Sequence, residues 1–182
     1  MQGAGAMKSQ GMTVKKGITL LRETELFKGL NEGEIEKILN LCKEVRFKKN
    51  ETVMREGEVG DELYIVIEGI VEVAKNLILE EPADDGNLSN KVFTKLKAED
   101  HAVFGEMALL EESERTATIT ALTDCVFYKI KKFNFLKLAE ADHELGYKIL
   151  LNISRIVSSR LRKANEDIIK LTTALSIILK ES

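Results

Sequence analysis

The chain has 182 residues, 44% of them hydrophobic and 31% charged, which is enough for one folded domain with a sizeable core and an appendage. Its net charge is −3 at pH 7 and no run of Lys and Arg reaches five residues, which argues against a surface dedicated to nucleic acid or to an anionic membrane. The sequence has neither an apolar run of about 18 residues nor the apolar core of a signal peptide, so we expect a cytoplasmic protein without a membrane span.

The N-terminal part is predicted to be a polar tail followed by helices. The opening MQGAGAMKSQGM is small and polar, and we expect disorder over residues 1–16. From Gly17 to Cys42 the pattern is helical. Asn31 can cap a helix here, because Glu34 stands three residues later and completes a capping box.

The middle of the chain is predicted to be mainly β-structure. Residues 45–76 are rich in Val, Ile, Tyr and Phe and are interrupted by glycines, a pattern typical of a β-sandwich or barrel. The acidic segment LEEPADDGNLSN (79–90) holds the only Pro and is expected to be an exposed turn between strands. Further strands are predicted over Val92–Leu96, Thr118–Leu122 and Cys125–Ile130.

Everything after Lys131 is predicted to be helical, with a short helix over about Phe133–Glu140 and a long one over about Glu144–Leu179. From Val157 onward the apolar positions of the long helix alternate steps of four and three residues, which is the spacing of a coiled-coil seam. We therefore expect a parallel homodimer through this helix. The seam contains Leu150, Val157, Leu161, Ala164, Ile168, Leu171, Leu175 and Ile178. The predicted division is a tail (1–16), a β-domain with N-terminal helices (17–142) and the long helix (143–182).

The stretch FGEMALLEESERTATITA (104–121) holds the candidate binding residues. Gly105 can adopt a positive φ and allow close approach of a ligand, and the residues behind it favour a short helix whose first N–H groups would attract an anion. Arg115 is the only Lys or Arg between Lys97 and Lys129, and a guanidinium pairs well with a phosphate diester. Glu106 accepts hydrogen bonds and suits a ligand hydroxyl. A sugar phosphate fits these groups, but an internal ion pair between Glu106 and Arg115 is an open alternative.

The segments FGEMALL and RTATITA, with ten residues from Gly105 to Arg115, resemble the phosphate-binding cassette of cyclic nucleotide-binding domains. The resemblance extends to LFKGLNEGEIEKI and to VMREGEVGDELYIVIEGIVEV, and covers about Leu26 to Leu161. It implies an α+β, mainly β fold: a double-stranded β-helix jelly-roll barrel with N-terminal helices and a long C-terminal dimerisation helix. It also implies a non-catalytic regulatory module that binds cAMP or cGMP.

The resemblance assigns a role to several residues. Arg115 would bind the cyclic phosphate, and Glu106 would accept the ribose 2′-hydroxyl. Backbone N–H groups near Met107, Ala108 and Thr116 would complete the phosphate cradle. The full predicted ligand-binding set is Gly105, Glu106, Met107, Ala108, Arg115, Thr116, Ala117 and Asn165.

The C-terminal helix would act as a lid in the resembling proteins, sometimes with a residue from the dimer mate. Counting along the helix by that resemblance places Ala164 and Asn165 near the pocket mouth. The amide of Asn165 could then contact a purine edge, although an ordinary solvated helix residue remains an equal alternative.

The cassette departs from the family pattern at several positions. Glu114 stands where many members have Pro, and it places a negative charge beside the phosphate site. His101 and Ala102 replace a common Gly–Asp pair. Thr116 stands where many members have Ala or Ser, and its hydroxyl is compatible with cGMP without excluding cAMP.

Other functions are less consistent with the sequence. A cupin-like metalloenzyme would need clustered ligands, but His101 and His143 stand far apart, and no metal is expected. Cys42 and Cys125 have no metal-type spacing and are expected to be buried thiols rather than a disulfide or a nucleophile. A transcription regulator would need a helix-turn-helix domain after the long helix, where the sequence ends, so no direct nucleic-acid or membrane binding is expected. A ligand-free structural jelly roll is a further alternative, and the sequence does not identify a downstream protein partner.

Overall fold

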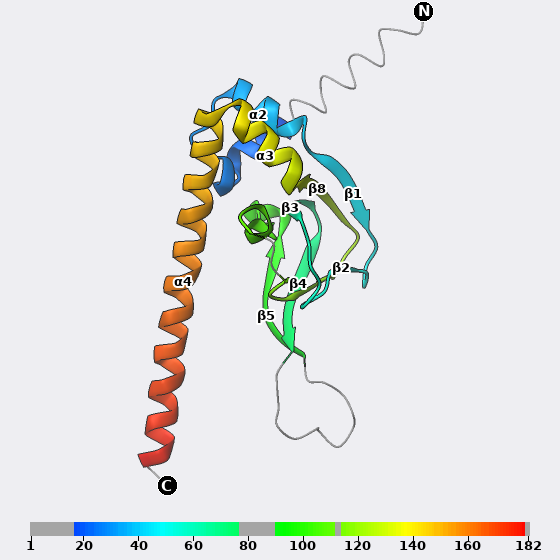
Figure 1. The fold of residues 1–182 in the computed structure, drawn as a ribbon. Helices are drawn as coiled ribbons and strands as arrows, with labels where there is room; N and C mark the ends of the chain where they lie inside the picture. Colours follow the sequence, from blue (N-terminus) through cyan, green and yellow to red (C-terminus); the bar gives the residue numbers. More distant parts are fainter. Residues whose placement is uncertain (1–16, 77–89, 112–113, 181–182) are drawn as a thin grey trace, which may run out of the picture.

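The computed structural model describes residues 17–76, 90–111 and 114–180, in which two β-sheets lie beside a long helix (Figure 1). The helical elements are a helix over residues 17–23, the 3-10 turn η1 (Glu25–Phe27), α2 (Glu32–Leu39), the 3-10 turns η2 (Ala98–Asp100) and η3 (Glu106–Leu109), α3 (Lys132–Ala141) and α4 (His143–Lys180). The strands are β1 (Lys43–Phe47), β2 (Thr52–Met54), β3 (Glu62–Glu68), β4 (Ile70–Asn76), β5 (Asn90–Lys97), β6 (Val103–Phe104), β7 (Thr118–Ala121) and β8 (Cys125–Lys131). The predicted tail and nearly all of the predicted acidic turn lie outside the described residues.

The strands form two antiparallel sheets of four strands, in the orders β1-β8-β3-β6 and β2-β7-β4-β5. In the second sheet Val71 of β4 lies opposite both Leu96 of β5 and Ala121 of β7. The mainly β fold with a long C-terminal helix is therefore confirmed, as a β-sandwich. Pairing that would close the two sheets into a barrel is not found among the described residues.

Strand β3 is buried on both faces and joins two apolar cores. Tyr64 and Val66 pack in the core between the sheets, whereas Leu63 and Ile65 pack against the helices. Because successive side chains of a strand point to opposite faces, the uninterrupted apolar run in this strand serves both cores. The helix over residues 17–23, η1, α2, α3 and the first turns of α4 form a helical cap, and this cap and the sandwich are thus one packing unit.

Within the helical cap, α2 begins at the capping box predicted for Asn31 and Glu34. The side chain of Asn31 accepts from the Glu34 backbone N–H at 3.0 Å, and the Glu34 carboxylate accepts from the Asn31 N–H at 2.7 Å. The capping box is therefore confirmed. Lys148 of α4 also donates to Glu34, at 2.7 Å, and this hydrogen bond is the main cause that lowers the pKa of the Glu34 carboxyl. The start of α2 is thus tied directly to α4.

The first turns of α4 are held in the cap by a buried amide. The Nδ2 of Asn152, which is 4% exposed, donates to the backbone carbonyls of Leu26 at 3.0 Å and Lys28 at 2.9 Å. Arg155 donates in turn to the Asn152 Oδ1 at 3.1 Å. The side chain therefore satisfies one carbonyl within η1 and one directly after it, and fixes the direction in which α4 leaves the cap.

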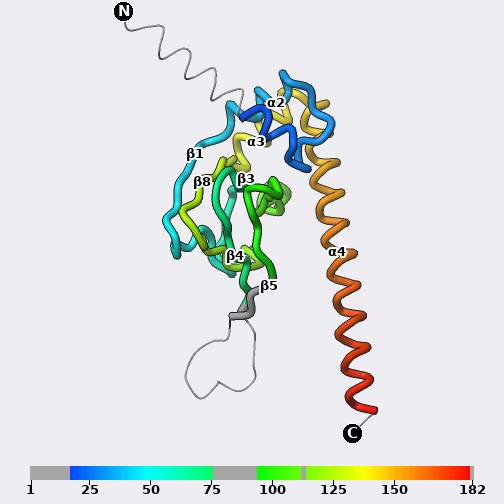
Figure 2. Tube along the Cα trace, turned by 180° about the vertical axis from the view of Figure 1, so that it is seen from behind, coloured from blue at the N-terminus to red at the C-terminus, as the bar shows by residue number. Residues whose placement is uncertain are grey.

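After the cap, α4 runs alongside the sandwich and its last turns stand clear of it (Figures 1 and 2). Leu145, Gly146, Ile149, Asn152 and Ile153 are its buried residues, and every described residue from Ser158 onward is exposed. A helix on a globular body is normally buried along one face. The second half of α4 therefore exposes apolar side chains of the predicted seam, among them Leu161, Ile168 and Leu175.

We predict that Asn152→Leu lowers the free energy of unfolding by about 2–4 kcal/mol, because two buried carbonyl groups lose their donor while the side-chain volume is kept. Urea denaturation measures this change. Asn165→Leu is the matched control, because the same substitution is made at an exposed position of the same helix and should change the stability by no more than about 0.5 kcal/mol. Equal stability of the two variants would contradict the role of the buried amide.

Candidate functional site

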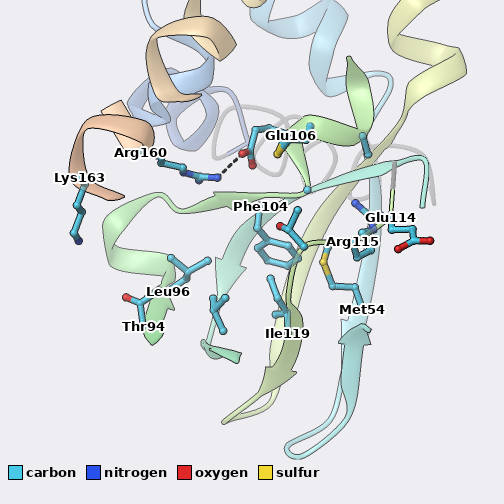
Figure 3. Close-up of a pocket in the computed structure, with 15 residues that line it drawn as sticks. Met54, Thr94, Leu96, Phe104, Glu106, Glu114, Arg115, Ile119, Arg160 and Lys163 are labelled. Atoms are coloured by element: carbon cyan, nitrogen blue, oxygen red, sulfur yellow. Dashed lines mark hydrogen bonds and ion pairs between the residues drawn. The ribbon is translucent and has the colours of Figure 1, made fainter. Parts of the chain in front are cut away.

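A cavity of about 400 Å³ opens between the second sheet, η3 and α4 (Figure 3). This volume is in the range of sites for small organic ligands. It is lined by Met54, Val73, Thr94, Leu96, Phe104, Gly105, Glu106, Met107, Ala108, Glu114, Arg115, Thr116, Ile119, Arg160 and Lys163. Most of its wall is apolar, and the charged groups come from η3, the loop before β7, and α4.

Arg115 places a buried guanidinium against this cavity. The residue is 8% exposed, and its Nη2 donates to the backbone carbonyl of Glu62 at 2.9 Å. The Glu62 carboxylate lies 3.7 Å away and is shared with Lys129, whose Nζ is 3.1 Å from it. One carboxylate thus stands between two cations, so Arg115 is held in place but its charge is not fully compensated, and an anion in the cavity would be attracted.

Two glycines make room for that guanidinium. A Cβ on Gly60 would lie 2.2 Å from the Arg115 Nε, and one on Gly105 would lie 2.8 Å from its Nη1. Gly105 also has φ +74°, in the left-handed region that favours glycine, and it is the residue from which η3 begins. Both positions therefore require the absence of a side chain.

Glu106 is 4% exposed and is paired with Arg160 of α4 rather than with Arg115. Arg160 also donates to the Val103 carbonyl at 3.1 Å, so its guanidinium bridges the turn before η3 and the helix (Figure 3). A buried carboxylate is stable only when it is paired or hydrogen-bonded. The internal Glu106–Arg115 pair considered from the sequence is not formed: each residue has a different partner.

The charges around the cavity suit a ligand with a single negative charge. Three cationic side chains line it, from Arg115, Arg160 and Lys163, against the two carboxylates of Glu106 and Glu114. A phosphate diester carries one negative charge, which would balance this excess.

One wall of the cavity is formed by an aromatic ring that packs on other rings. Phe104, which lines the cavity, stacks on Tyr64 with ring centroids 5.2 Å apart and an interplanar angle of 13°. Burial raises the pKa of the Tyr64 hydroxyl to about 12, so this group is neutral at physiological pH. A flat apolar ligand group would find a well-ordered surface here.

The structure brings six of the eight predicted ligand-binding residues to the cavity. Ala117 and Asn165 do not line it, whereas Gly105, Glu106, Met107, Ala108, Arg115 and Thr116 do. The Ala108 N–H, predicted to face a phosphate, donates to the Gly105 carbonyl at 3.1 Å. The short helix predicted behind Gly105 is only the 3-10 turn η3.

Ala164 and Asn165, predicted near the pocket mouth, are not part of the cavity lining, whereas Arg160 and Lys163 of the same helix are. Arg160 follows the buried Ile153 by seven residues, and Lys163 follows the half-buried Ile156 by seven, so both continue the face that meets the body. Asn165 is two residues beyond Lys163 and lies on another, exposed face. The helical spacing of Ile149, Ile153 and Ile156 in the sequence was the signal that could have placed Arg160 and Lys163 on the face of α4 toward the body.

The profile of the cyclic nucleotide-binding domain family matches residues 44–142, more than half of the chain. The chain belongs to this family. Strands β2 to β8, η3 and Arg115 lie within the matched range, β1 begins one residue before it, and α4 follows it.

Two curated relatives of this chain are regulators by name. The chain is 30% identical over 118 residues to a cAMP-dependent protein kinase regulatory subunit of Dictyostelium discoideum, covering 64% of this chain and 34% of the relative. It is 28% identical over 150 residues to a CRP-like cAMP-activated global transcriptional regulator of Mycobacterium tuberculosis, covering 82% of this chain and 60% of the relative. The chain thus spans about a third and three-fifths of these two relatives.

A solved cyclic nucleotide-binding domain from Methylobacillus flagellatus has the same fold. Its TM-score is 0.71 at 20% identity, and the match covers 87% of this chain and 83% of the other. At this identity the likeness concerns the fold alone.

Neither a metal centre nor a membrane-spanning helix is found among the described residues. Within residues 17–76, 90–111 and 114–180 no group of three or more His, Cys, Asp or Glu could hold a metal ion. No helix in these ranges is long and apolar enough to cross a membrane. Both cysteines are free, and burial raises the pKa of the Cys42 thiol to about 12, so it is not a thiolate at neutral pH.

We predict that Gly60→Ala displaces the Arg115 guanidinium and lowers the free energy of unfolding by about 1–3 kcal/mol, because the new methyl group would overlap the Nε. Thermal or urea unfolding measures this loss. In the control Gly33→Ala, within α2, the new Cβ meets nothing closer than 3.5 Å, and the change should be neutral or stabilising by up to about 1 kcal/mol. Equal effects at the two glycines would show that the space around Arg115 is not restricted.

Proposed function

We propose that the chain is a non-catalytic regulatory module that binds a cyclic nucleotide, cAMP or cGMP, in the cavity between the second sheet and α4. The observation that carries this proposal is the buried, incompletely neutralised guanidinium of Arg115 at the cavity wall, 8% exposed and fitted between two glycines. Membership of the cyclic nucleotide-binding family and the names of the regulatory relatives, one cAMP-dependent and one cAMP-activated, support it.

The cyclic phosphate would pair with Arg115, whose planar donors match two phosphate oxygens. The N–H groups of Met107 and Thr116 would add to this cradle. The Ala108 N–H would join them only by sharing or giving up its bond to the Gly105 carbonyl. The hydroxyl of Thr116, on an exposed residue of the cavity lining, would also reach the phosphate or a base edge.

The ribose would bind at Glu106. Arg160 donates to its Oε1, and its Oε2 has no hydrogen-bond donor among the described residues. A carboxylate oxygen accepts more than one hydrogen bond, so the 2′-hydroxyl would donate to the second oxygen without displacing Arg160. This arrangement joins the ligand to α4 through one carboxylate.

We predict that Arg115→Ala weakens cyclic nucleotide binding by about 2–4 kcal/mol, because a charge-assisted pair with the phosphate is lost. Isothermal titration calorimetry with cAMP and cGMP measures the affinity, and circular dichroism checks the fold. Glu106→Gln should cost less and should bind the 2′-deoxy ligand as well as the ribose ligand.

Arg162→Ala is the control for this prediction, because it removes an exposed arginine of α4 that does not line the cavity. It should leave the affinity unchanged. If the wild type binds neither nucleotide, the alternative of a ligand-free structural domain is favoured. If Arg115→Ala binds as tightly as the wild type, the phosphate does not sit at Arg115.

We also propose that α4 forms a parallel homodimer along its apolar seam. Leu161 and Ile168 are each 60% exposed and Leu175 is 56% exposed, one heptad apart on the exposed second half of α4. Apolar residues at this spacing are the seam of a two-stranded coiled coil. Asn165 does not line the cavity of its own chain. Its amide would therefore have to contact the base in the cavity of the partner protomer.

We predict that Leu161→Lys together with Ile168→Lys gives a monomer in sedimentation equilibrium, because two like charges per helix would be brought into the seam. A truncation before Val157 should do the same. Thr173→Lys, an exposed position five residues from Ile168 and off the seam, should leave the dimer intact. A dimer of unchanged affinity in the double variant would rule out this interface.

A further inference from the structure

The cavity has two ends of different chemistry. Arg115 and Glu114 lie at one end, and Thr94, Leu96 and Lys163 lie on the opposite side, with Phe104 between them (Figure 3). Glu106 and Arg160 occupy the rim between these ends (Figure 3). A ligand that reaches from Arg115 past Glu106 therefore extends toward Thr94 and Lys163.

The proposed function fixes the orientation of such a ligand, and the present inference rests on it. With the phosphate at Arg115 and the ribose hydroxyl at Glu106, the purine would be left for the end formed by β4, β5 and α4. Val73 and Leu96 supply apolar surface there for the faces of the base. The edge of the base would meet Thr94 and Lys163, the polar side chains that the described lining has at this end.

Lys163 is directed to this end by the geometry of α4. It follows Ile149 by two heptads and Ile156 by one, and these residues pack against the body of the protein. Lys163 makes no hydrogen bond or ion pair with any residue in the described ranges. Its ammonium group is therefore available to a ligand.

We infer that Lys163 reads the edge of the base and makes the site prefer a 6-oxo purine, so that cGMP binds more tightly than cAMP. A lysine ammonium has three donors and no acceptor. Guanine presents two acceptors on one edge, O6 and N7, whereas adenine presents the N7 acceptor beside the N6 amino donor. The ammonium gains a second acceptor only from guanine, and it faces a donor in adenine.

Thr94 does not cancel this preference. A hydroxyl rotates and both donates and accepts, so it serves either base equally. Glu114, the exposed carboxylate of the cavity lining that could accept from an amino group, lies at the Arg115 end (Figure 3). The discriminating charge at the base end is thus that of Lys163. Because the Lys163 side chain is exposed, we expect cGMP to bind about 5- to 10-fold more tightly than cAMP, which is the lower end of the range for a side chain that reads a base.

The test is calorimetric titration of the full chain with cGMP, cAMP and cyclic IMP. Cyclic IMP has the O6 and N7 of guanine but no 2-amino group, so contact of Lys163 with that edge predicts that it binds like cGMP. Lys163→Met keeps the length of the side chain and removes the charge. It should lower the cGMP and cyclic IMP affinities about 5- to 10-fold, leave cAMP nearly unchanged, and bring the three affinities together.

Lys170→Met is the matched control, because Lys170 lies one heptad further on the same face of α4 and does not line the cavity. It should keep the wild-type order. A wild type that prefers cAMP, or a cGMP preference that survives Lys163→Met, overturns the inference. A cyclic IMP affinity equal to that of cAMP overturns it too, because the 2-amino group would then be the feature that is read.

The two proposals fail differently. Tight binding of cAMP and cGMP without preference contradicts the role of Lys163 and leaves the proposed function standing. Absence of binding by all three nucleotides contradicts both.

Discussion

The structure around the cavity depends on keeping one guanidinium buried. Taking the charge of Arg115 out of water is costly unless opposite charge and hydrogen-bond acceptors surround it. Glu62 supplies a backbone carbonyl and a carboxylate, and Gly60 and Gly105 leave the space. Since Lys129 shares the carboxylate of Glu62, the compensation is partial. The site thus retains attraction for an anion, and the family to which the chain belongs is one whose ligands carry a cyclic phosphate.

A second buried charge connects this site to the long helix. Glu106 sits at the start of η3, directly after the glycine that contacts Arg115, and its partner is Arg160 of α4. Beyond Ile153 no residue of α4 is buried among those described, so the Arg160 contacts with Glu106 and Val103 are main contributors to its position beside the sandwich. The carboxylate proposed to bind the ribose is the same group that fixes the helix.

Local features of the fold could be predicted from the sequence, because each depends on neighbouring residues. The capping box of Asn31 and Glu34 needs only their spacing, and the long helix follows from its apolar period. The place of Gly105 and Arg115 beside each other followed from a family resemblance. The part of Glu62 in holding Arg115 was missed, because its carbonyl is brought there by the path of β3. The packing of Ile149, Asn152 and Ile153 in the cap decides which face of α4 meets the body. Arg160 and Lys163 were missed because the apolar pattern of the helix sequence is mainly that of the seam, which lies on another face.

The proposed dimer seam and the proposed ligand contacts occupy different faces of one helix, and this has a thermodynamic consequence. Val157 and Leu161 of the seam flank Arg160, so a rotation or shift of α4 that alters the Glu106–Arg160 pair also moves the seam residues. If a nucleotide favours one arrangement of this helix, the dimer formed in that arrangement must favour the nucleotide by the same factor. The pairing of Glu106 with Arg160 holds α4 beside the cavity. The free energy available to move the helix is therefore limited to the difference in ligand affinity between its two positions, not the whole affinity.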